Sequence, residues 1–366
     1  MGRMKELAFA LTLLAVCVLT GYTTEAKEFK VYWNVPTFMC HNRGVYFNVT
    51  KFGIIQNADD IFQGDKVNIW YHPGKFPHLE GNKSVDGGIP QNGNLEDHIN
   101  TFTEQVETMP VDFDGVAVLD FEYYLPSYAR APKEYKEASH DWVSSQHPDW
   151  SAEDVEAESE RSFNSSIRDY MEVALEIGAD LRPNGLWGYY HYPYCKNHGG
   201  VVECGNLISE MNDNTLWIYE ASKAMYPSIY LLKSEGVDGR KNMALGRILE
   251  SQRLNEMLSK PAAILTYCWY RYHEVEEFIT PEDIMNTIGL SKERKLDGSV
   301  IWGSSNDLNT KEKCLQYQEY VEDVLGPLVK SILEMPETLL RLVLESPGLM
   351  AEFISLATDK SRQWDQ

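Results

Sequence analysis

The chain has 366 residues, with 55 acidic residues against 33 basic ones and a formal net charge of −22. This balance argues against nucleic acid or an anionic membrane as a partner. It disfavours a polyanionic substrate less strongly, because a Debye length of ~8 Å in physiological salt lets only nearby charges, such as those lining a groove, act on it.

The N-terminus has the layout of a secretory signal peptide over residues 1–26. Arg3 and Lys5 precede an apolar run over residues 7–19, and small and polar residues follow it. We therefore predict a secreted, extracellular protein. The apolar run is shorter than the ~20 residues that span a bilayer, so no membrane span is predicted. An N-terminal anchor that is never cleaved is the alternative.

Export would allow disulfides to form. The predicted mature chain contains five cysteines, which are Cys40, Cys195, Cys204, Cys268 and Cys314. An odd count leaves one thiol over. Cys268 lies inside an apolar stretch, so we interpret it as a small buried residue rather than a nucleophile. No pair of Cys or His residues has the spacing of a zinc site, and no metal is predicted.

Three Asn-x-Ser/Thr tripeptides begin at Asn48, Asn82 and Asn164. Each is a candidate N-glycosylation acceptor on the surface of an exported chain. Such tripeptides also arise by chance, but three of them behind a signal peptide favour the use of at least one.

Short apolar and aromatic runs recur along the chain and predict buried strands. They are residues 30–35, 67–71, 116–119, 185–190, 216–219, 228–231, 262–267 and 299–302. Segments with helical periodicity separate several of them. These segments are residues 94–108, 152–179, 246–260 and 281–290. Alternating strands and helices are typical of a parallel sheet.

Seven or eight strands, without a Gly-x-Gly-x-x-Gly fingerprint or a linker, favour a closed barrel over an open dinucleotide-binding sheet. We therefore predict an α/β fold, a TIM-like (β/α) barrel over residues 27–330. Its chemistry is expected at the C-terminal ends of the strands. Residues 331–366 predict a helical C-terminal extension of two short amphipathic helices. Packing on the barrel is its simplest role, with a partner or a lipid surface as alternatives.

The predicted strand at residues 116–119 ends in two acids, Asp120 and Glu122. Side chains alternate along a strand, so both carboxyl groups share one face, which in a barrel is the interior. Two neighbouring carboxylates repel each other, and this repulsion raises one pKa. A carboxyl group that stays protonated near neutral pH is the acid that a glycosidase needs. An acidic strand end that merely meets water is the alternative interpretation.

The placement of the acids also bears on the mechanism. Retaining glycosidases with a carboxylate nucleophile hold two carboxyl groups ~5 Å apart on opposite sides of the scissile bond. Neighbours on one strand face approach from the same side, which indicates that the 2-acetamido oxygen of the substrate is the nucleophile. One carboxyl group then donates the proton and the other orients the acetamido group. The substrate is therefore expected to carry an N-acetyl sugar.

Aromatic residues lie near other predicted strand ends, where their faces can stack on sugar rings. They are Tyr71, Tyr189, Tyr190, Tyr192, Tyr194, Tyr226, Trp269 and Trp302. Each alone is better explained as a core residue, but together they favour a carbohydrate groove. The loop histidines His72, His191 and His198 lack a neighbouring Ser or Cys nucleophile and are given no catalytic role.

Several stretches, in the same order along the chain, resemble the animal hyaluronidases of the venom and mammalian type. The resemblance is strongest to the venom and salivary members. The resemblance runs from about Phe29 to about Leu328. The matching stretches are Val31-Tyr-Trp-Asn-Val-Pro-Thr-Phe-Met-Cys40, Gly88-Ile-Pro-Gln91, Gly93-Asn-Leu95, residues 115–122, Trp187-Gly-Tyr-Tyr-His-Tyr-Pro-Tyr-Cys195, Pro227-Ser-Ile-Tyr230, Ile301-Trp-Gly-Ser-Ser305 and Asn309-Thr-Lys-Glu-Lys-Cys-Leu315.

The resemblance implies a distorted barrel and endo-hydrolysis of the β-1,4 bond after N-acetylglucosamine in hyaluronan, with no cofactor. It places the proton donor at Glu122 and the acid that positions the acetamido group at Asp120. It also implies substrate-binding aromatic residues, which are Tyr71, Tyr190, Tyr226 and Trp302. The implied disulfides join Cys40 to Cys314 and Cys195 to Cys204, which leaves Cys268 free.

The sequence departs from the family just after the acids. Family members usually continue with Trp-Arg-Pro, whereas this chain has Tyr124-Leu125-Pro126. Leu125 removes a guanidinium suited to holding a uronate, and the nearest basic residue downstream is Arg130. The choice between hyaluronan and chondroitin is therefore open. His72, where venom members tend to carry an acid, is a smaller departure.

The main hypothesis is a secreted, monomeric hyaluronidase with a glycosaminoglycan substrate. One alternative is a hydrolase that prefers chondroitin, because Leu125 replaces an arginine. Another is a catalytically silent glycan-binding protein. The intact acids argue against this last alternative, because a binder gains little from two repelling carboxylates.

Overall fold

The computed structural model describes residues 28–81 and 83–359. The predicted signal peptide at residues 1–26 lies outside the described residues, as do Asn82 and the last seven residues of the predicted extension. In the described part of the chain, no helix is both long enough and apolar enough to cross a membrane.

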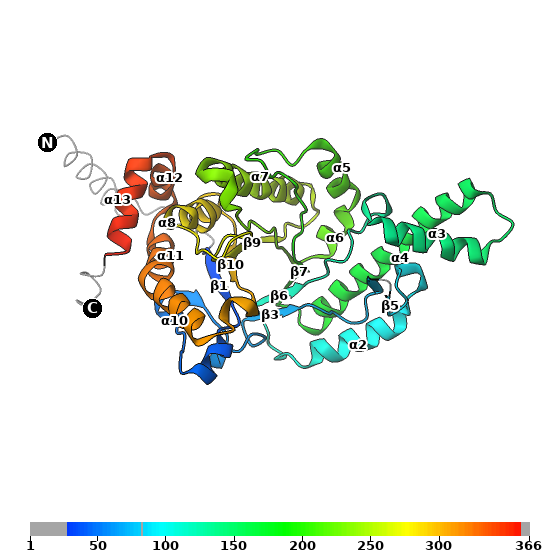
Figure 1. The fold of residues 1–366 in the computed structure, drawn as a ribbon, viewed down its shortest axis with the longest axis horizontal. Coiled ribbons are helices and arrows are strands. Elements are labelled where there is room, and N and C mark those ends of the chain that lie inside the picture. The colour runs from blue at the N-terminus through cyan, green and yellow to red at the C-terminus, as the bar shows by residue number, and fades with distance from the viewer. Residues whose placement is uncertain (1–27, 82, 360–366) are drawn as a thin grey trace.

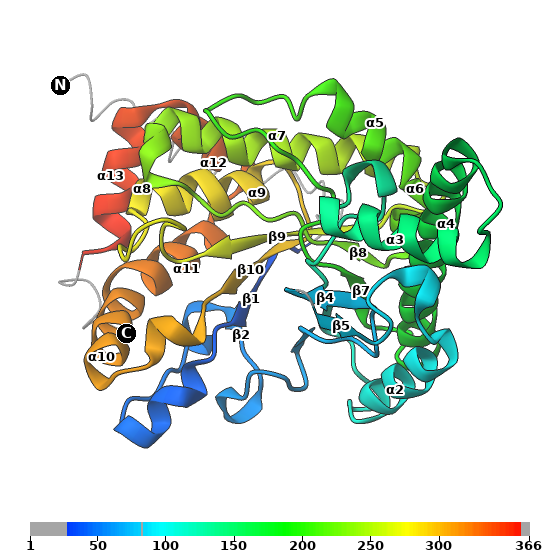
Figure 2. The same cartoon turned by 45° about the vertical axis from the view of Figure 1, so that its right-hand side comes forward.

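Within residues 28–81 and 83–359, seven of the parallel strands form the main wall of the barrel. They are β1 (Lys30–Asn34), β3 (Val67–Trp70), β6 (Val116–Leu119), β7 (Leu186–Tyr189), β8 (Ala224–Met225), β9 (Ala263–Trp269) and β10 (Gly298–Trp302). Figure 2 shows β9, β10 and β1 in the middle of the molecule with helices outside them. Ladders run in the order β3–β6–β7 and in the order β8–β9–β10–β1. A parallel bridge between Tyr190 and Tyr226 joins β7 to β8. The predicted (β/α) barrel is confirmed.

The barrel is distorted between β1 and β3. The short strand β2 (Ile54–Ile55) pairs with β1, and the side chain of Asn57 continues the connection to β3. Asn57 Nδ2 donates to the carbonyl oxygen of Val67 at 2.9 Å, and Asn57 Oδ1 accepts from the backbone amides of Val67 and Lys66 at 2.8 Å. A side-chain amide thus replaces part of a strand ladder.

Side-chain alternation divides the strands between an inner core and two outer cores. The inner core includes Val67, Ile69, Val116, Val118, Tyr267 and Val300. The intervening residues Ala117 and Leu119 of β6 belong to an outer core beneath α2 and α4, and Val31 and Ile301 belong to the other, beneath the later helices. The alternation of inward and outward side chains predicted for the strand before the acids is therefore the alternation observed in the barrel.

Helices cover the outside of the barrel. They are α2 (Leu95–Glu107), α3 (Lys133–Gln146), α4 (Ala152–Leu181), α5 (Asn206–Asn214), α6 (Leu216–Ala221), α7 (Gly236–Met257), α8 (Pro281–Ile284), α9 (Leu290–Glu293), α10 (Lys311–Tyr320), α11 (Gly326–Glu334), α12 (Glu337–Glu345) and α13 (Pro347–Ala357). Figure 1 shows α2–α4 at one side of the molecule and α10–α13 at the other. A hairpin of β4 (His78–Glu80) and β5 (Lys83–Val85) lies apart from the barrel sheet.

Two predicted strands are wrong. Residues 216–219 belong to α6, because a short apolar run carries no period that separates a strand from a buried helix. Residues 228–231 form no ladder beyond a single bridge at Ser228. The strand there is β8, which ends before Pro227, a residue without an amide proton to donate.

The C-terminal helices pack on the barrel helices. Leu340 of α12 is fully buried, and Met350 of α13 belongs to the same outer core. Arg341 Nε donates to Glu293 Oε1 of α9 at 2.7 Å. The division predicted at residue 330 falls inside α11.

Candidate active site

The two acids lie at the C-terminal end of β6. The backbone amide of Asp120 donates to the carbonyl oxygen of Trp70 at 2.9 Å, so Asp120 extends the ladder between β3 and β6. Alternation puts Asp120 and Glu122 on the interior face, while Phe121 packs in the outer core. Asp120 is only 8% exposed, whereas Glu122 is exposed. A buried carboxyl group thus neighbours an accessible one.

The surroundings raise the pKa of both acids. Burial and the charge of Glu122 raise the pKa of Asp120 to about 8. Although its side chain is accessible, partial burial of the carboxyl group also raises the pKa of Glu122, against the contact with Asp120 and the positive charge of His273. Interacting carboxyl groups titrate together, so their shared proton belongs to the pair. The pair therefore retains a proton near neutral pH.

Three of the four predicted substrate-binding aromatic residues lie beside these acids. Tyr71 follows β3, Tyr190 follows β7, and Trp302 ends β10, with Trp302 Nε1 donating to Tyr71 Oη at 3.0 Å. Burial and the charges of Asp120 and Glu122 raise the pKa of Tyr71 to about 12. Burial and the charge of Glu122 also raise the pKa of Tyr190. Both phenol groups are thus within electrostatic reach of the acid pair.

The fourth residue, Tyr226, is not in this group, which corrects its predicted role. Its side chain is 0% exposed, and its hydroxyl group donates to the carbonyl oxygen of Leu186 at the N-terminal end of β7. Its ring meets Tyr267 edge-on, with 5.8 Å between ring centroids. A side chain without accessible surface cannot contact a sugar, so Tyr226 fills the barrel interior.

Tyr230 is the tyrosine of this segment that lies with the other aromatic residues. Its half-buried ring stacks on Trp302 with 5.7 Å between centroids, and its centroid is 6.0 Å from that of Tyr190. The sequence carried a signal for it, because residues 226, 228 and 230 share one face of an extended segment and the last is nearest the C-terminal end.

Trp269, another of the predicted aromatic residues, completes the wall. Its ring meets Trp302 edge-on at 5.1 Å between centroids. Its Nε1 donates to Asp307 Oδ2 at 2.9 Å, and the same oxygen accepts from Tyr270 Oη at 3.0 Å. Asp307 also pairs with Arg271. This buried network fixes the indole before any ligand arrives.

The remaining predicted aromatic residues support the site from behind. Tyr189 and Tyr192 are buried in the outer core, and Tyr189 Oη donates to the carbonyl oxygen of Met171 at 3.1 Å. Tyr194 is half-buried in the loop after β7. Tyr189 and Tyr194 do not join the wall. Burial and the charge of Glu122 raise the pKa of Tyr192, so this buried tyrosine lies within electrostatic reach of the acids.

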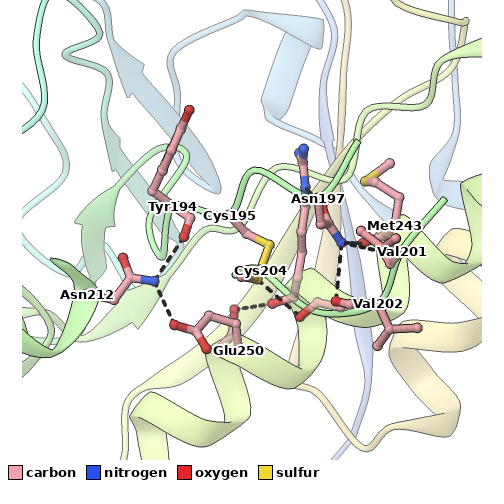
Figure 3. The surroundings of a disulfide bond; sticks show 12 residues. Tyr194, Cys195, Asn197, Val201, Val202, Cys204, Asn212, Met243 and Glu250 are labelled. Atoms are coloured by element: carbon pink, nitrogen blue, oxygen red, sulfur yellow. Dashed lines mark hydrogen bonds between the residues drawn. A yellow bond between two sulfur atoms is a disulfide. The ribbon is translucent and has the colours of Figure 1, made fainter. Parts of the chain in front are cut away.

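A disulfide between Cys195 and Cys204 closes the loop after β7 (Figure 3). Asn212 Nδ2 donates to the carbonyl oxygen of Tyr194 at 2.9 Å and to Glu250 Oε1 of α7 at 2.7 Å. The loop that follows Tyr190 is thereby tied to two helices.

The other cysteines and the described sequons also have clear positions. A second disulfide joins Cys40 to Cys314, and Cys268 is a buried free thiol. Asn48 is exposed in a loop. Asn164 is half-buried within α4, and its Oδ1 accepts from the backbone amide of Tyr128 at 2.7 Å.

Few cations lie near the acids. Leu125 packs against the outer core, and Arg130 is exposed at the end of a short 3-10 turn. His273 is exposed, with its ring centroid 5.7 Å from that of Trp269, and its charge acts on Glu122. Sequence reasoning missed His273 because it lies in a loop four residues beyond β9. Among the described residues, no group of three or more His, Cys, Asp or Glu side chains could hold a metal ion.

Comparison with known proteins identifies the family. A family model described as hyaluronidase matches residues 20–338. The hyaluronidase of Dolichovespula maculata is 37% identical over 323 residues, which cover 84% of this chain and 98% of the relative. Hyaluronidase Tab y 2.0101 of Tabanus yao is 34% identical over 339 residues, which cover 88% of this chain and 96% of the relative. The chain belongs to the hyaluronidase family.

Solved hyaluronidase structures share this fold. The crystal structure of bee venom hyaluronidase gives a TM-score of 0.78 at 37% identity, covering 83% of this chain and 100% of that chain. The same enzyme in complex with a hyaluronic acid tetramer gives a TM-score of 0.79 at 36% identity, covering 83% of this chain and 99% of that chain. The family and the barrel predicted from the sequence are confirmed.

Proposed function

We propose that this hyaluronidase family member is a secreted endo-N-acetylhexosaminidase that hydrolyses β-1,4 bonds of hyaluronan. The observation that carries the proposal is the pair Asp120 and Glu122 at the C-terminal end of a barrel strand, beside aromatic side chains that follow or end five other strands. The complex of bee venom hyaluronidase with a hyaluronic acid tetramer supports the choice of polymer.

In the proposed reaction, Glu122 is the acid and then the base. The acetamido oxygen of the substrate attacks the anomeric carbon while the glycosidic C–O bond breaks, and Glu122 donates its proton to the leaving oxygen. Water then attacks the same carbon and gives a proton to Glu122, which reopens the ring formed by the acetamido group. Two displacements at one carbon retain its configuration.

Asp120 has the supporting role. We assign it to orienting the acetamido group and stabilising the positive charge that develops on its nitrogen. Because Asp120 is almost fully buried, water screens its charge weakly, and its interaction with that nitrogen is correspondingly stronger.

The aromatic wall is assigned to substrate binding. Tyr71, Tyr190 and Trp302 keep the role that the resemblance implied, and Tyr230 takes the place of Tyr226. The stacked rings of Tyr230 and Trp302 fix each other's orientation, so little side-chain entropy remains to be lost when a sugar binds.

Export is part of the proposal. The signal-peptide pattern at residues 1–26 and the two disulfides support entry into an oxidising compartment. The oxidised state of the chain is consistent with the extracellular polymer that we assign as its substrate.

A second candidate function is a preference for chondroitin. It rests on Leu125, whose half-buried side chain packs against the outer core where the family usually has an arginine. The loss of a guanidinium removes a bidentate contact for a uronate carboxylate, which both polymers carry.

The test measures the chain length of hyaluronan and, separately, of unsulfated chondroitin during incubation with the purified protein. We expect hyaluronan to be shortened, and Glu122→Gln to lower the rate by at least ~100-fold because the general acid is lost. Faster cleavage of chondroitin would establish the second candidate. If a folded wild-type protein cut neither polymer, the proposed activity would be refuted and glycan binding would remain.

A further inference from the structure

The segment from Val45 to Val49 is a loop that leads into the 3-10 turn Thr50–Phe52, and exposed and buried residues alternate along it up to Thr50. Val45, Phe47 and Val49 are buried, and Tyr46, Asn48 and Thr50 are exposed. The aromatic ring, the amide and the hydroxyl group are thus the outward-facing groups of this segment, and a hydrogen bond joins Thr50 to Asn48.

Contacts from both sides hold this loop in place. Gln56 Nε2 donates to the carbonyl oxygen of Phe47, and Gln56 Oε1 accepts from the backbone amide of Val49, each at 3.3 Å. Gln318 Nε2 donates to the carbonyl oxygen of Tyr46 at 2.7 Å. The ring of Phe47 lies 5.5 Å from that of Tyr317 between centroids. The outer face is thus presented by a fixed backbone.

The sequon residues already contact each other on this face. Thr50 Oγ1 donates to Asn48 Oδ1 at 2.6 Å, which leaves the Nδ2 group of Asn48 as the free end of the amide. Tyr46 precedes Asn48 by two residues and is 64% exposed, an unusually large accessible surface for a side chain of this size.

The ring of Tyr46 also borders a hollow. One side of the ring lies against His41, with 5.0 Å between centroids. A surface cavity of about 540 Å³ adjoins both rings, and Phe47, Thr50 and Gln56 contribute to its lining. Neither catalytic candidate lines this cavity, so it is separate from the proposed active site.

We propose that Asn48 carries an N-linked glycan whose first N-acetylglucosamine packs on the ring of Tyr46 beside this cavity. The apolar C–H face of a pyranose complements an aromatic face, and Tyr46 is the exposed aromatic ring two residues before the exposed Asn48. The glycan covers aromatic surface that is otherwise exposed to water, and it stabilises the fold by doing so.

Attachment requires a lipid-pyrophosphate-linked oligosaccharide as the donor. Asn48 Nδ2 forms a bond to C1 of the first sugar while the bond from C1 to the pyrophosphate oxygen breaks. The pyrophosphate leaves with the bonding electron pair, and the amide proton passes to a base of the transferring enzyme. The proposal rests on entry into the secretory pathway and is independent of the roles of Asp120 and Glu122.

The experiment uses the full chain secreted from insect cells behind a heterologous signal peptide, so that failure of its own export would not affect the result. Ser84→Ala and Ser166→Ala remove the other two sequons without changing Asn164. Mass spectrometry of the peptide containing Asn48 is expected to show an N-linked glycan. An unmodified Asn48 in the secreted protein would overturn the proposal.

The stacking is tested in the same background by thermal unfolding. We expect the glycosylated protein to melt ~2 °C above its amidase-treated form, and trimming to a single N-acetylglucosamine to preserve the difference. In Tyr46→Ala the difference should vanish, whereas Trp150→Ala, an exposed aromatic residue elsewhere, should preserve it. An equal difference with and without Tyr46 would show that the sugar does not pack on this ring.

Discussion

At the residue scale, the proposed chemistry depends on a proton held by the pair Asp120 and Glu122. Burial raises the pKa of both acids, and the charge of Glu122 raises the pKa of Asp120 further, so the environment opposes the fully ionised pair. A raised pKa keeps the protonated form present to higher pH. An activity that needs this proton is therefore complete below the raised pKa and is lost as the pH rises through it.

The pH profile of Asp120→Asn tests this coupling. We expect hydrolysis of hyaluronan to fall by at least ~100-fold, because the acetamido group loses its partner. We also expect the alkaline limb to move to lower pH, because it reflects two carboxyl groups held in one site, where the charge of Glu122 raises the pKa of Asp120. Measured kcat/KM across pH 4 to 10 checks both effects, and an unshifted alkaline limb would contradict the coupling.

At the element scale, the segment after β8 passes from the barrel core to the aromatic wall within four residues. Tyr226 is fully buried with its hydroxyl group bonded to a backbone carbonyl, whereas Tyr230 stacks in the aromatic wall. These two tyrosines form a matched pair, one structural and one at the site.

Substitution of each tyrosine should separate stability from binding. Tyr226→Phe removes a buried hydrogen bond and should lower the free energy of unfolding by about 1–3 kcal/mol with KM unchanged. Tyr230→Leu removes a stacking surface and should raise KM for hyaluronan ~10-fold with little loss of stability. Urea unfolding and initial rates distinguish them, and a raised KM in Tyr226→Phe with normal stability would reverse the assignment.

The sequence predicted elements where its pattern had a period. The alternation around Asp120 predicted the strand β6, and the apolar face of residues 94–108 predicted the helix α2. The side chain of Asn94 caps that helix, as expected of an asparagine at a helix start. The run at residues 216–219 was too short to carry a period. The helix α3 was not anticipated, and α7 begins at Gly236, ten residues before its predicted start.

Contacts between residues far apart in the sequence could not be predicted from the sequence pattern. The bridge from Asn57 to Val67 is made by a side chain and leaves no periodic trace. The position of His273 near Glu122 depends on how the loop after β9 folds. The two acids of the proposed active site could be predicted because they continue a strand, whereas His273 could not because it belongs to a loop.

At the scale of the whole molecule, the C-terminal helices share a core with the barrel. Leu340, Val343 and Leu344 of α12 lie in the cluster that contains β1 and β10 residues. Lys292 Nζ of α9 donates to the carbonyl oxygens of Leu333 and Met335 at the end of α11. We propose that residues 28–359 unfold as one unit.

Leu340→Ala tests this unity. The side chain is fully buried, so the substitution should lower the free energy of unfolding by about 2–5 kcal/mol in a single transition. Leu342→Ala is the control on the same helix, because Leu342 is 53% exposed and its truncation should change stability by less than ~0.5 kcal/mol. Chemical denaturation followed by tryptophan fluorescence and by activity gives the comparison. An early, separate transition of the C-terminal helices would contradict a single unit.

In the proposed mechanism, two carboxyl groups on one face of one strand act together with the acetamido group of the substrate. Proton NMR of the newly formed reducing end during the first turnovers of hyaluronan oligosaccharides tests this directly. We expect the β-anomer to appear first and then to mutarotate, because two displacements occur at the same carbon. Initial formation of the α-anomer would show a single displacement by water and would contradict the mechanism.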